Sequence, residues 1–240
     1  MIKTDILIIG AGPTGLFAVF EAGLLKLKCH LIDALPQPGG QCSEIYPKKP
    51  IYDIPAYPEI LAGDLTTKLL EQIASFQPGF TLGERAETIE KLEDDTFIVT
   101  TNKGTKHHAP IIAIAGGLGS FEPRKPPIPN IANFEDTGVE YIIRDPEMYR
   151  NKKVIIAGGG DSALDWAIFL SDVAAQVSLV HRRNEFRGAL DSVDKVQELK
   201  DAQKINLITP AEVKGIQGKN KVTGVSIIKN GEEEILLEVD

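Results

Sequence analysis

Asp5-Ile6-Leu7-Ile8-Ile9-Gly10-Ala11-Gly12-Pro13-Thr14-Gly15 is the stretch of this sequence that decides the fold. Its apolar first half predicts a buried strand, and its glycines, at the spacing G-x-G-x-x-G, predict a tight turn from which a helix begins. The apolar-periodic residues 16–25 continue that helix, and residues 28–33 follow as a second strand. A strand, a glycine turn, a helix and a strand within about 30 residues form the βαβ unit of a parallel sheet.

This first glycine turn, residues 10–15, suits a pyrophosphate, because glycine lets the backbone approach closely and the helix N-terminus attracts anions. Asp33 stands about 20 residues on, at the end of the next strand, which makes the fingerprint more specific than its spacing alone. That carboxylate suits a ribose hydroxyl and would repel a 2′-phosphate, so the site favours FAD or NAD over NADP. A turn kept only for tight helix–strand packing is the alternative. The predicted contacts are Gly10, Gly12, Pro13, Thr14, Gly15 and Asp33.

The same organisation returns in the second half of the chain. Gly158-Gly159-Gly160-Asp161-Ser162-Ala163 is a G-x-G-x-x-A turn between a predicted strand, residues 153–157, and a predicted helix. After the next strand, residues 176–180, come His181-Arg182-Arg183 and then Arg187. Arginines at this place suit a 2′-phosphate, so the second glycine turn, residues 158–163, predicts NADP(H), with a solvated basic surface as the alternative. The predicted contacts are Gly158, Gly159, Gly160, Asp161, Ser162, Ala163, His181, Arg182, Arg183 and Arg187.

Between the two turns the pattern changes several times. Residues 35–63 are rich in Pro, Gly and Tyr and predict an ordered loop, and residues 64–76 predict a helix. The alternating residues 80–109 predict an antiparallel meander, and residues 111–115 a strand that returns to the parallel sheet. Residues 121–130 hold four prolines and predict the domain boundary.

These patterns predict an α/β fold with two Rossmann-like three-layer dinucleotide-binding domains, each with a parallel sheet and an inserted antiparallel β-meander. Residues 1–117 form the predicted FAD-binding domain and residues 118–240 the NADPH-binding domain. A net charge of −8 argues against a nucleic-acid-binding surface. No apolar run reaches the roughly 20 residues of a membrane span. The N-terminus lacks the layout of a signal peptide, so a cytoplasmic location is expected.

Cysteine and histidine offer little sign of a metal site. The two cysteines, Cys29 and Cys42, match neither a zinc site nor a Cys-x-x-Cys pair, so we expect no metal and no disulfide. Cys42 is expected to be a small packed residue. His107-His108, within the predicted meander, is expected to face solvent rather than bind a metal.

Two such units, the meander, and Ile112-Ala113-Ile114-Ala115-Gly116-Gly117 before a Pro-rich linker together resemble the two-dinucleotide-binding flavoprotein superfamily. The branch most similar is that of the thioredoxin reductases, whose Gly-Gly-Gly-Asp-Ser-Ala turn and His-Arg-Arg-x-x-x-Arg run stand here at residues 158–163 and 181–187. Thioredoxin reductases carry a Cys-x-x-Cys before the second fingerprint strand. The matching residues 141–145 contain no cysteine, so dithiol exchange is not expected.

The sequence resembles, more narrowly, the thioredoxin-reductase-like ferredoxin–NADP reductases, which keep both dinucleotide sites and omit the disulfide. Their pattern Leu-Pro-x-x-Gly-Gly-Gln, then Tyr-Pro and Ile-Tyr-Asp, stands here at residues 35–41, 46–47 and 51–53. The resemblance covers the chain from Asp5 to Asp240. It implies FAD contacts from Thr14, Asp33, Gln41, Tyr46, Ala86 and Phe121, with Tyr46 against the isoalloxazine ring.

The resemblance also implies an activity: electrons pass from NADPH through FAD to a one-electron carrier such as ferredoxin or flavodoxin, in a homodimer. No catalytic side chain is expected, because the cofactors carry the chemistry. Alternatives are an NADPH-dependent flavin or quinone diaphorase, a thioredoxin-reductase-like protein without a redox disulfide, and a non-catalytic NADPH-binding redox sensor. Members of this family continue past the position of Asp240 with a segment that completes the FAD domain, so we expect the first site to be incomplete here.

Overall fold

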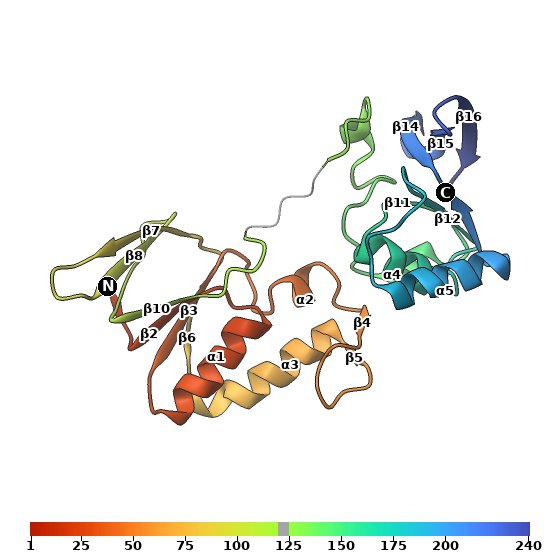
Figure 1. The fold of residues 1–240 in the computed structure, drawn as a ribbon. Coiled ribbons are helices and arrows are strands. Elements are labelled where there is room, and N and C mark those ends of the chain that lie inside the picture. The colour runs from red at the N-terminus through yellow and green to blue at the C-terminus, as the bar shows by residue number, and fades with distance from the viewer. Residues whose placement is uncertain (120–124) are drawn as a thin grey trace. The chain divides into compact units, whose positions relative to one another are not determined.

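The chain folds into two compact units, Met1–Pro123 and Arg124–Asp240. A computed structural model describes residues 1–119 and 125–240 (Figure 1). The boundary predicted at residues 121–130 begins in residues outside the described part of the chain. Each unit has a parallel sheet, with helices on one face and antiparallel strands on the other. The predicted α/β class with inserted meanders is confirmed.

The first unit is built on a four-stranded parallel sheet of order β10-β2-β3-β6. Its strands are β10 (Ile111–Ile114), β2 (Ile6–Ile9), β3 (Cys29–Asp33) and β6 (Gly79–Leu82). Alternate side chains point to opposite faces, so Ile8 and Leu31 pack under the helices while Leu7 and Ile32 face the other way. The order changes direction between β2 and β10, which is where such sheets bind ligands.

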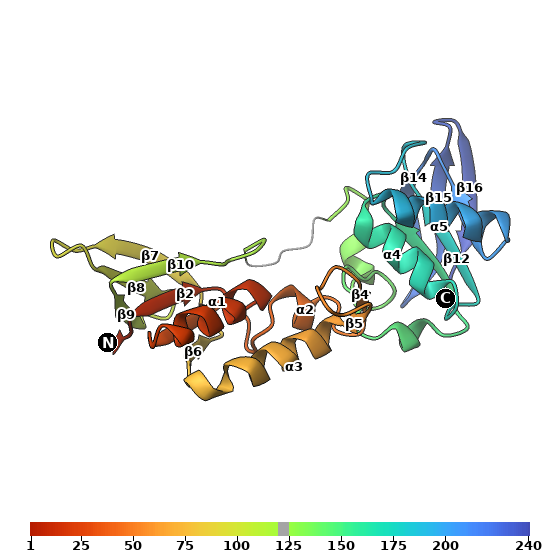
Figure 2. The same ribbon diagram turned by 60° about the horizontal axis from the view of Figure 1, so that its bottom comes forward.

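Two helices cover one face of this sheet. α1 (Pro13–Leu24) follows the first glycine turn, and α3 (Ala62–Ile73) packs alongside it before a 3₁₀ turn at Ala74–Phe76 (Figures 1 and 2). The predicted helix at 64–76 is therefore confirmed with earlier bounds. The predicted loop 35–63 holds only short elements, α2 (Gln41–Glu44), β4 (Pro50–Ile51) and β5 (Ile60–Leu61).

The meander covers the opposite face, in the order β1-β9-β8-β7. Its antiparallel strands are β7 (Ala86–Lys91), β8 (Phe97–Thr101) and β9 (Lys106–Ala109), and β1 (Ile2–Lys3) pairs in parallel with β9 at the edge of this sheet. The alternating pattern predicts that this meander begins at residue 80, but Phe80 and Thr81 lie in β6 and pair in parallel with β3. A half-buried strand alternates in the same way in either kind of sheet, so the pattern alone could not separate them.

A network of hydrogen bonds between buried side chains joins the parallel sheet of the first unit to its meander. His30 of β3 and His107 of β9 each hydrogen-bond Thr81 Oγ1, at 2.8 Å and 2.9 Å, and both rings are buried. The prediction that His107 faces solvent is wrong, because its side chain is fully buried. Adjacent strand residues point to opposite faces, and His108 is the outer one, where Thr96 Oγ1 lies 2.9 Å from its Nε2.

The second unit repeats the plan with a three-stranded parallel sheet of order β11-β12-β13. Its strands are β11 (Lys153–Ala157), β12 (Gln176–Val180) and β13 (Ile205–Ile208). α4 (Asp161–Leu170) and α5 (Leu190–Asp201) pack on one face through Leu164, Leu170 and Val196. The short 3₁₀ segments Ile131–Phe134 and Pro146–Tyr149 precede the sheet.

An antiparallel sheet covers the other face of this second parallel sheet. It comprises β14 (Ala211–Gly218), β15 (Val222–Lys229) and β16 (Glu233–Glu238), and Val180 and Ile208 pack against its buried Ile227. After β16, the Asp240 N–H donates to Lys153 O at 3.1 Å, and Lys153 N–H donates to Asp240 Oδ2 at 2.9 Å. Within residues 125–240, no strand pairs with this outer edge of β11.

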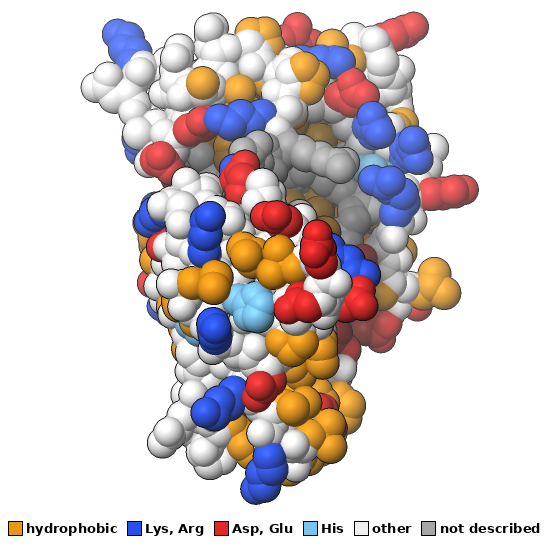
Figure 3. Space-filling model, turned by 90° about the vertical axis from the view of Figure 1, so that its left-hand side faces the viewer, with side chains coloured by type: hydrophobic (Ala, Val, Ile, Leu, Met, Phe, Trp, Pro, Cys, Tyr) orange, Lys and Arg blue, Asp and Glu red, His pale blue; other side chains and the backbone are white. Residues whose placement is uncertain are grey.

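Charges of both signs are interspersed over the face of the molecule drawn in Figure 3, and hydrophobic side chains also reach this surface. Several large apolar side chains of the first unit are exposed, among them Leu24, Leu25 and Ile89. None of the described helices is both long and apolar enough to span a bilayer.

Candidate dinucleotide-binding sites

The first glycine turn closes β2 at the point where the strand order reverses. Gly10 has a φ of +107° and donates its N–H to Ile32 O at 2.8 Å. A Cβ on Gly10 would overlap the carbonyl of Ala115, and one on Gly15 would overlap the carbonyl of Gly10. Both positions therefore need glycine for close packing.

Gly12 caps the start of α1 and has different surroundings. No side chain caps this helix, and a Cβ on Gly12 would have only Gly40 within 4 Å, at 3.9 Å. Pro13 occupies the first helical position, and Thr14 is exposed beside it. The side of this helix end is therefore open, which fits the predicted binding of an anion by its N–H groups.

Asp33 stabilises the first glycine turn through hydrogen bonds, and it also lies at the position predicted to contact a ribose. Its Oδ2 accepts the Ala11 N–H at 2.7 Å and its Oδ1 accepts the Leu35 N–H at 2.9 Å. The carboxylate thereby ties the end of β3 to the turn. Each of its oxygens keeps a further lone pair, so the group can still accept a hydrogen bond from a ribose hydroxyl.

The loop after β3 folds back onto the same turn. Gly39 N–H donates to Ala11 O at 2.8 Å, and a Cβ on Gly40 would lie 3.1 Å from the Gly12 Cα. Gln41 begins α2, and its amide nitrogen would lie 3.6 Å from a Cβ on Gly117. The structure thus gathers Gln41 and the glycine turn, which are far apart in sequence, in one place.

Tyr46 lies just beyond α2 and is half-buried. Burial, together with the adjoining Cys42, raises the pKa of Tyr46 to about 12, so its phenol stays protonated at neutral pH. Lys49 Nζ lies 5.4 Å from the centroid of the ring. Burial also raises the pKa of the Cys42 thiol. Cys42 is a buried free cysteine, as expected of a packed residue.

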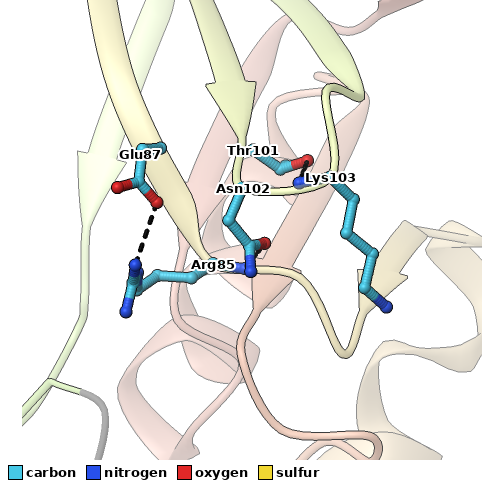
Figure 4. Close-up of polar contacts among 5 residues, drawn as sticks. All are labelled: Arg85, Glu87, Thr101, Asn102 and Lys103. Atoms are coloured by element: carbon cyan, nitrogen blue, oxygen red, sulfur yellow. Dashed lines mark hydrogen bonds and ion pairs between the residues drawn. The ribbon is translucent and has the colours of Figure 1, made fainter.

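Ala86 begins β7 close to Asp33, because the segment before it is hydrogen-bonded to the end of β3. Glu84 N–H donates to Asp33 O at 3.0 Å. The turn between β8 and β9 holds the same segment: Asn102 Oδ1 accepts the Arg85 N–H and Arg85 O accepts the Asn102 N–H, both at 2.9 Å (Figure 4). No motif or spacing in these segments indicates these contacts. Phe121, the other contact implied by the resemblance, lies outside the described residues.

The second glycine turn has the same build. Gly158 N–H donates to Val180 O at 3.0 Å, and a Cβ on Gly158 would lie 2.8 Å from the Ala163 Cβ, so the small residue at each place allows the helix to approach the strand. Gly160 caps α4 without a side-chain hydrogen bond and has open space on its Cβ side. Asp161 and Ser162 are exposed in the first turn of α4.

The arginines predicted to bind a 2′-phosphate follow β12. Arg182, Arg183 and Arg187 are all exposed. Within the described residues, no hydrogen bond or ion pair engages their guanidinium groups. Arg182 also interacts electrostatically with Glu212, whose pKa is lowered by Lys214 and then by Arg182. Three exposed guanidinium groups within six residues are nevertheless suited to an anion.

His181 differs from the neighbouring arginines because it is buried. Its ring stacks on Phe186 with centroids 5.2 Å apart, and a Cβ on Gly159 would overlap it. Burial, and then the nearby arginines, lower the pKa of His181. The structure places this residue beneath the turn rather than at its surface, so a direct contact with a cofactor stays a prediction.

Comparison with known proteins agrees with this duplicated plan. The family model described as pyridine nucleotide-disulphide oxidoreductase matches residues 4–240. The chain is 77% identical over 227 residues to ferredoxin–NADP reductase 2 of Christiangramia forsetii, covering 95% of this chain and 64% of that protein. It is 75% identical over 231 residues to a ferredoxin–NADP reductase of Flavobacterium johnsoniae, covering 96% of this chain and 66% of that protein.

A solved structure shows the same fold. The thioredoxin reductase of Lactococcus lactis is 26% identical and superposes with a TM-score of 0.84, covering 99% of this chain and 75% of that one. The chain spans slightly less than two thirds of the length of the two reductases named above. With a family model that matches it almost from end to end, the chain belongs to the pyridine nucleotide-disulphide oxidoreductase family.

Proposed function

We propose that this chain binds FAD at the first glycine turn and NADPH at the second, and that it passes electrons from NADPH through FAD to ferredoxin. The observation that carries the proposal is the opposite charge at matching positions of the two units. Asp33 follows the first βαβ unit, whereas Arg182, Arg183 and Arg187 follow the second. The names of the two ferredoxin–NADP reductases support ferredoxin as the acceptor.

Both turns fit these cofactors, because each has a glycine whose Cβ side is open or nearly so at an uncapped helix end. Gly12, Thr14 and Gln41 would hold FAD beside Asp33, and Gly160 and Ser162 would hold NADPH beside the arginines. When bound, the cofactors supply the electron-transfer chemistry. The protein orients them and keeps the 2′-phosphate distinct from an unphosphorylated ribose. Flavodoxin as a second carrier, a homodimer, a cytoplasmic location and the two domain assignments remain predictions.

The activity is tested on the full chain mixed with FAD. We expect the absorbance of a bound flavin, bleaching of that absorbance when NADPH is added without oxygen, and then reduction of a purified ferredoxin. A protein that bleaches but reduces only quinones or free flavin would instead be a diaphorase. A colourless protein that still binds NADPH would contradict the proposal that this chain binds FAD, and would favour either a sensor or an incomplete first site.

Arg182→Ala tests the assignment of the second turn. Loss of one charged hydrogen bond, about 1.5–3 kcal/mol, should weaken NADPH binding about 10- to 100-fold and leave NADH binding nearly unchanged. The measurement is the dissociation constant of each cofactor by calorimetry. Arg150→Ala is the matched control, because Arg150 is exposed in the same unit and pairs with Glu147 instead. Equal weakening of both cofactors would contradict the assignment.

A further inference from the structure

The segment that carries the three arginines is fastened to the second glycine turn at two points. Arg187 N–H donates to Gly159 O at 2.8 Å. Ala189 N–H donates to the Asp161 carboxylate, at 2.8 Å from Oδ1. Asp161 belongs to the turn itself, at the first residue of α4. The segment of residues 181–189 therefore leaves β12, passes over the turn and is returned to it before α5 begins.

Close packing also restricts the backbone of this segment near the two hydrogen bonds that attach it to the turn. The His181 ring lies between Gly159 and Phe186, and its Nε2 donates to Glu185 O at 3.1 Å. At the far end, a Cβ on Gly188 would overlap Leu164 and approach the Asp161 N to 3.3 Å. The backbone is closely packed at these places, while the arginine side chains between them stay exposed.

The negative charge of Asp161 stabilises the N-terminus of α4, but it does not favour binding of a phosphate there. Asp161 stands at the helix end where a pyrophosphate would bind, and it contacts the backbone of the segment whose arginines would bind a 2′-phosphate. A carboxylate there repels both anions and lowers their affinity. Its compensating contribution in this structure is the hydrogen bond to Ala189, which fixes the path of the arginine segment.

We propose that Asp161 is a positioning residue for selectivity: by holding the Ala189 N–H, it keeps the arginine segment where its guanidinium groups meet a 2′-phosphate. This inference rests on the proposed binding of NADPH at the second turn. It assigns Asp161 a contact with the protein backbone rather than with the cofactor. Two effects of the carboxylate then have opposite signs, because repulsion weakens phosphate binding and positioning strengthens it.

Two substitutions separate the effects. Asp161→Asn removes the charge but keeps an oxygen that accepts the Ala189 N–H, whereas Asp161→Ala removes both. The probes are 2′,5′-ADP and 5′-AMP, which differ in the 2′-phosphate, titrated into the full chain by calorimetry. We expect Asp161→Ala to reduce the preference for 2′,5′-ADP over 5′-AMP about tenfold. We expect Asp161→Asn to keep or increase this preference.

Hydrogen exchange supplies a second readout. The Ala189 amide should exchange faster in Asp161→Ala and at nearly the wild-type rate in Asp161→Asn. Asp172→Ala is the matched control: it removes an exposed carboxylate near the other end of α4, where Asp172 pairs with Lys204. This control should change neither the preference nor the exchange rate.

The outcomes distinguish the inference from the function on which it rests. If wild-type protein prefers 2′,5′-ADP through Arg182 but Asp161→Ala leaves or raises that preference, positioning by Asp161 is wrong and the NADPH site stands. If the wild-type protein shows no preference, or one that Arg182→Ala does not change, the proposed NADPH site itself is wrong and the inference fails with it.

Discussion

Gly10→Ala is expected to destabilise the first unit by about 4 kcal/mol, since it combines a strained backbone with an overlap. Gly10 has a φ of +107°, a conformation that residues with a side chain rarely adopt, and its Cβ would strike the carbonyl of Ala115. That contact joins the ends of β2 and β10 at the switch point of the sheet. Relief of the overlap would separate these strands, so FAD binding should be lost as well.

Gly104→Ala isolates the backbone cost. Gly104 also has a positive φ, +84°, but a Cβ there would meet nothing within 4 Å. The expected loss is about 1–2 kcal/mol. Urea denaturation followed by far-UV circular dichroism measures both variants. Trp166, the single tryptophan, lies in the second unit, and its fluorescence should report an unchanged transition there. Equal losses for the two variants would show that the contact with Ala115 is unimportant.

Acid should destabilise the first unit through His30. Burial, and then the neighbouring His107, lower the pKa of His30 from 6.5 to about 4. Above pH 6.5 the imidazole is neutral in both the folded and the unfolded state, so its stabilising contribution is fully present. As the pH falls from 6.5 to 4, His30 becomes protonated in the unfolded state while it stays largely neutral in the folded state. The free energy of unfolding should fall by about 3 kcal/mol across this window.

His107 adds to the effect in the same direction, because burial lowers its pKa too, against an opposing contribution from Glu84. The measurement is the urea-unfolding free energy of the first unit at several pH values between 4 and 7.5. His30→Asn should flatten the dependence, and His108→Gln, which changes the outer neighbour, should not. Proton NMR of the wild-type imidazoles provides a direct check: a His30 ring that titrates near pH 6.5 would contradict the prediction.

The sequence was informative wherever the chemistry is local. Both glycine turns, Asp33 and the arginines after β12 could be placed in advance, since each belongs to a short segment with a characteristic spacing. Burial of His107 could have been predicted in part, because adjacent strand residues cannot both face solvent. Whether His107 or His108 points inward depends on which face of the meander packs against the parallel sheet. The spacing of residues in the sequence does not indicate that face.

Contacts between segments that are distant in the sequence could not be predicted for the same reason. Asp161 and Ala189 are 28 residues apart, and no pattern in either segment predicts their hydrogen bond. Likewise, Asn102 holds Arg85 across a hairpin whose packing is set by the whole first unit. The predicted fold class includes a meander in the second unit, but no fingerprint indicates which residues form strands β13 to β16.

The outer edge of β11 in the second unit lies beside the second glycine turn, so a segment that paired with this edge would also lie beside that turn. In the first unit, β10 runs parallel to β2 and brings Ala115 to Gly10. In the second unit, the backbone of Asp240 meets Lys153, the first residue of β11. By strand alternation, Ile155 and Ala157 present their N–H and C=O groups on the same side as Lys153. A strand that added to this edge in the parallel sense would therefore end beside Gly158, and its last residues would form one side of the proposed NADPH site.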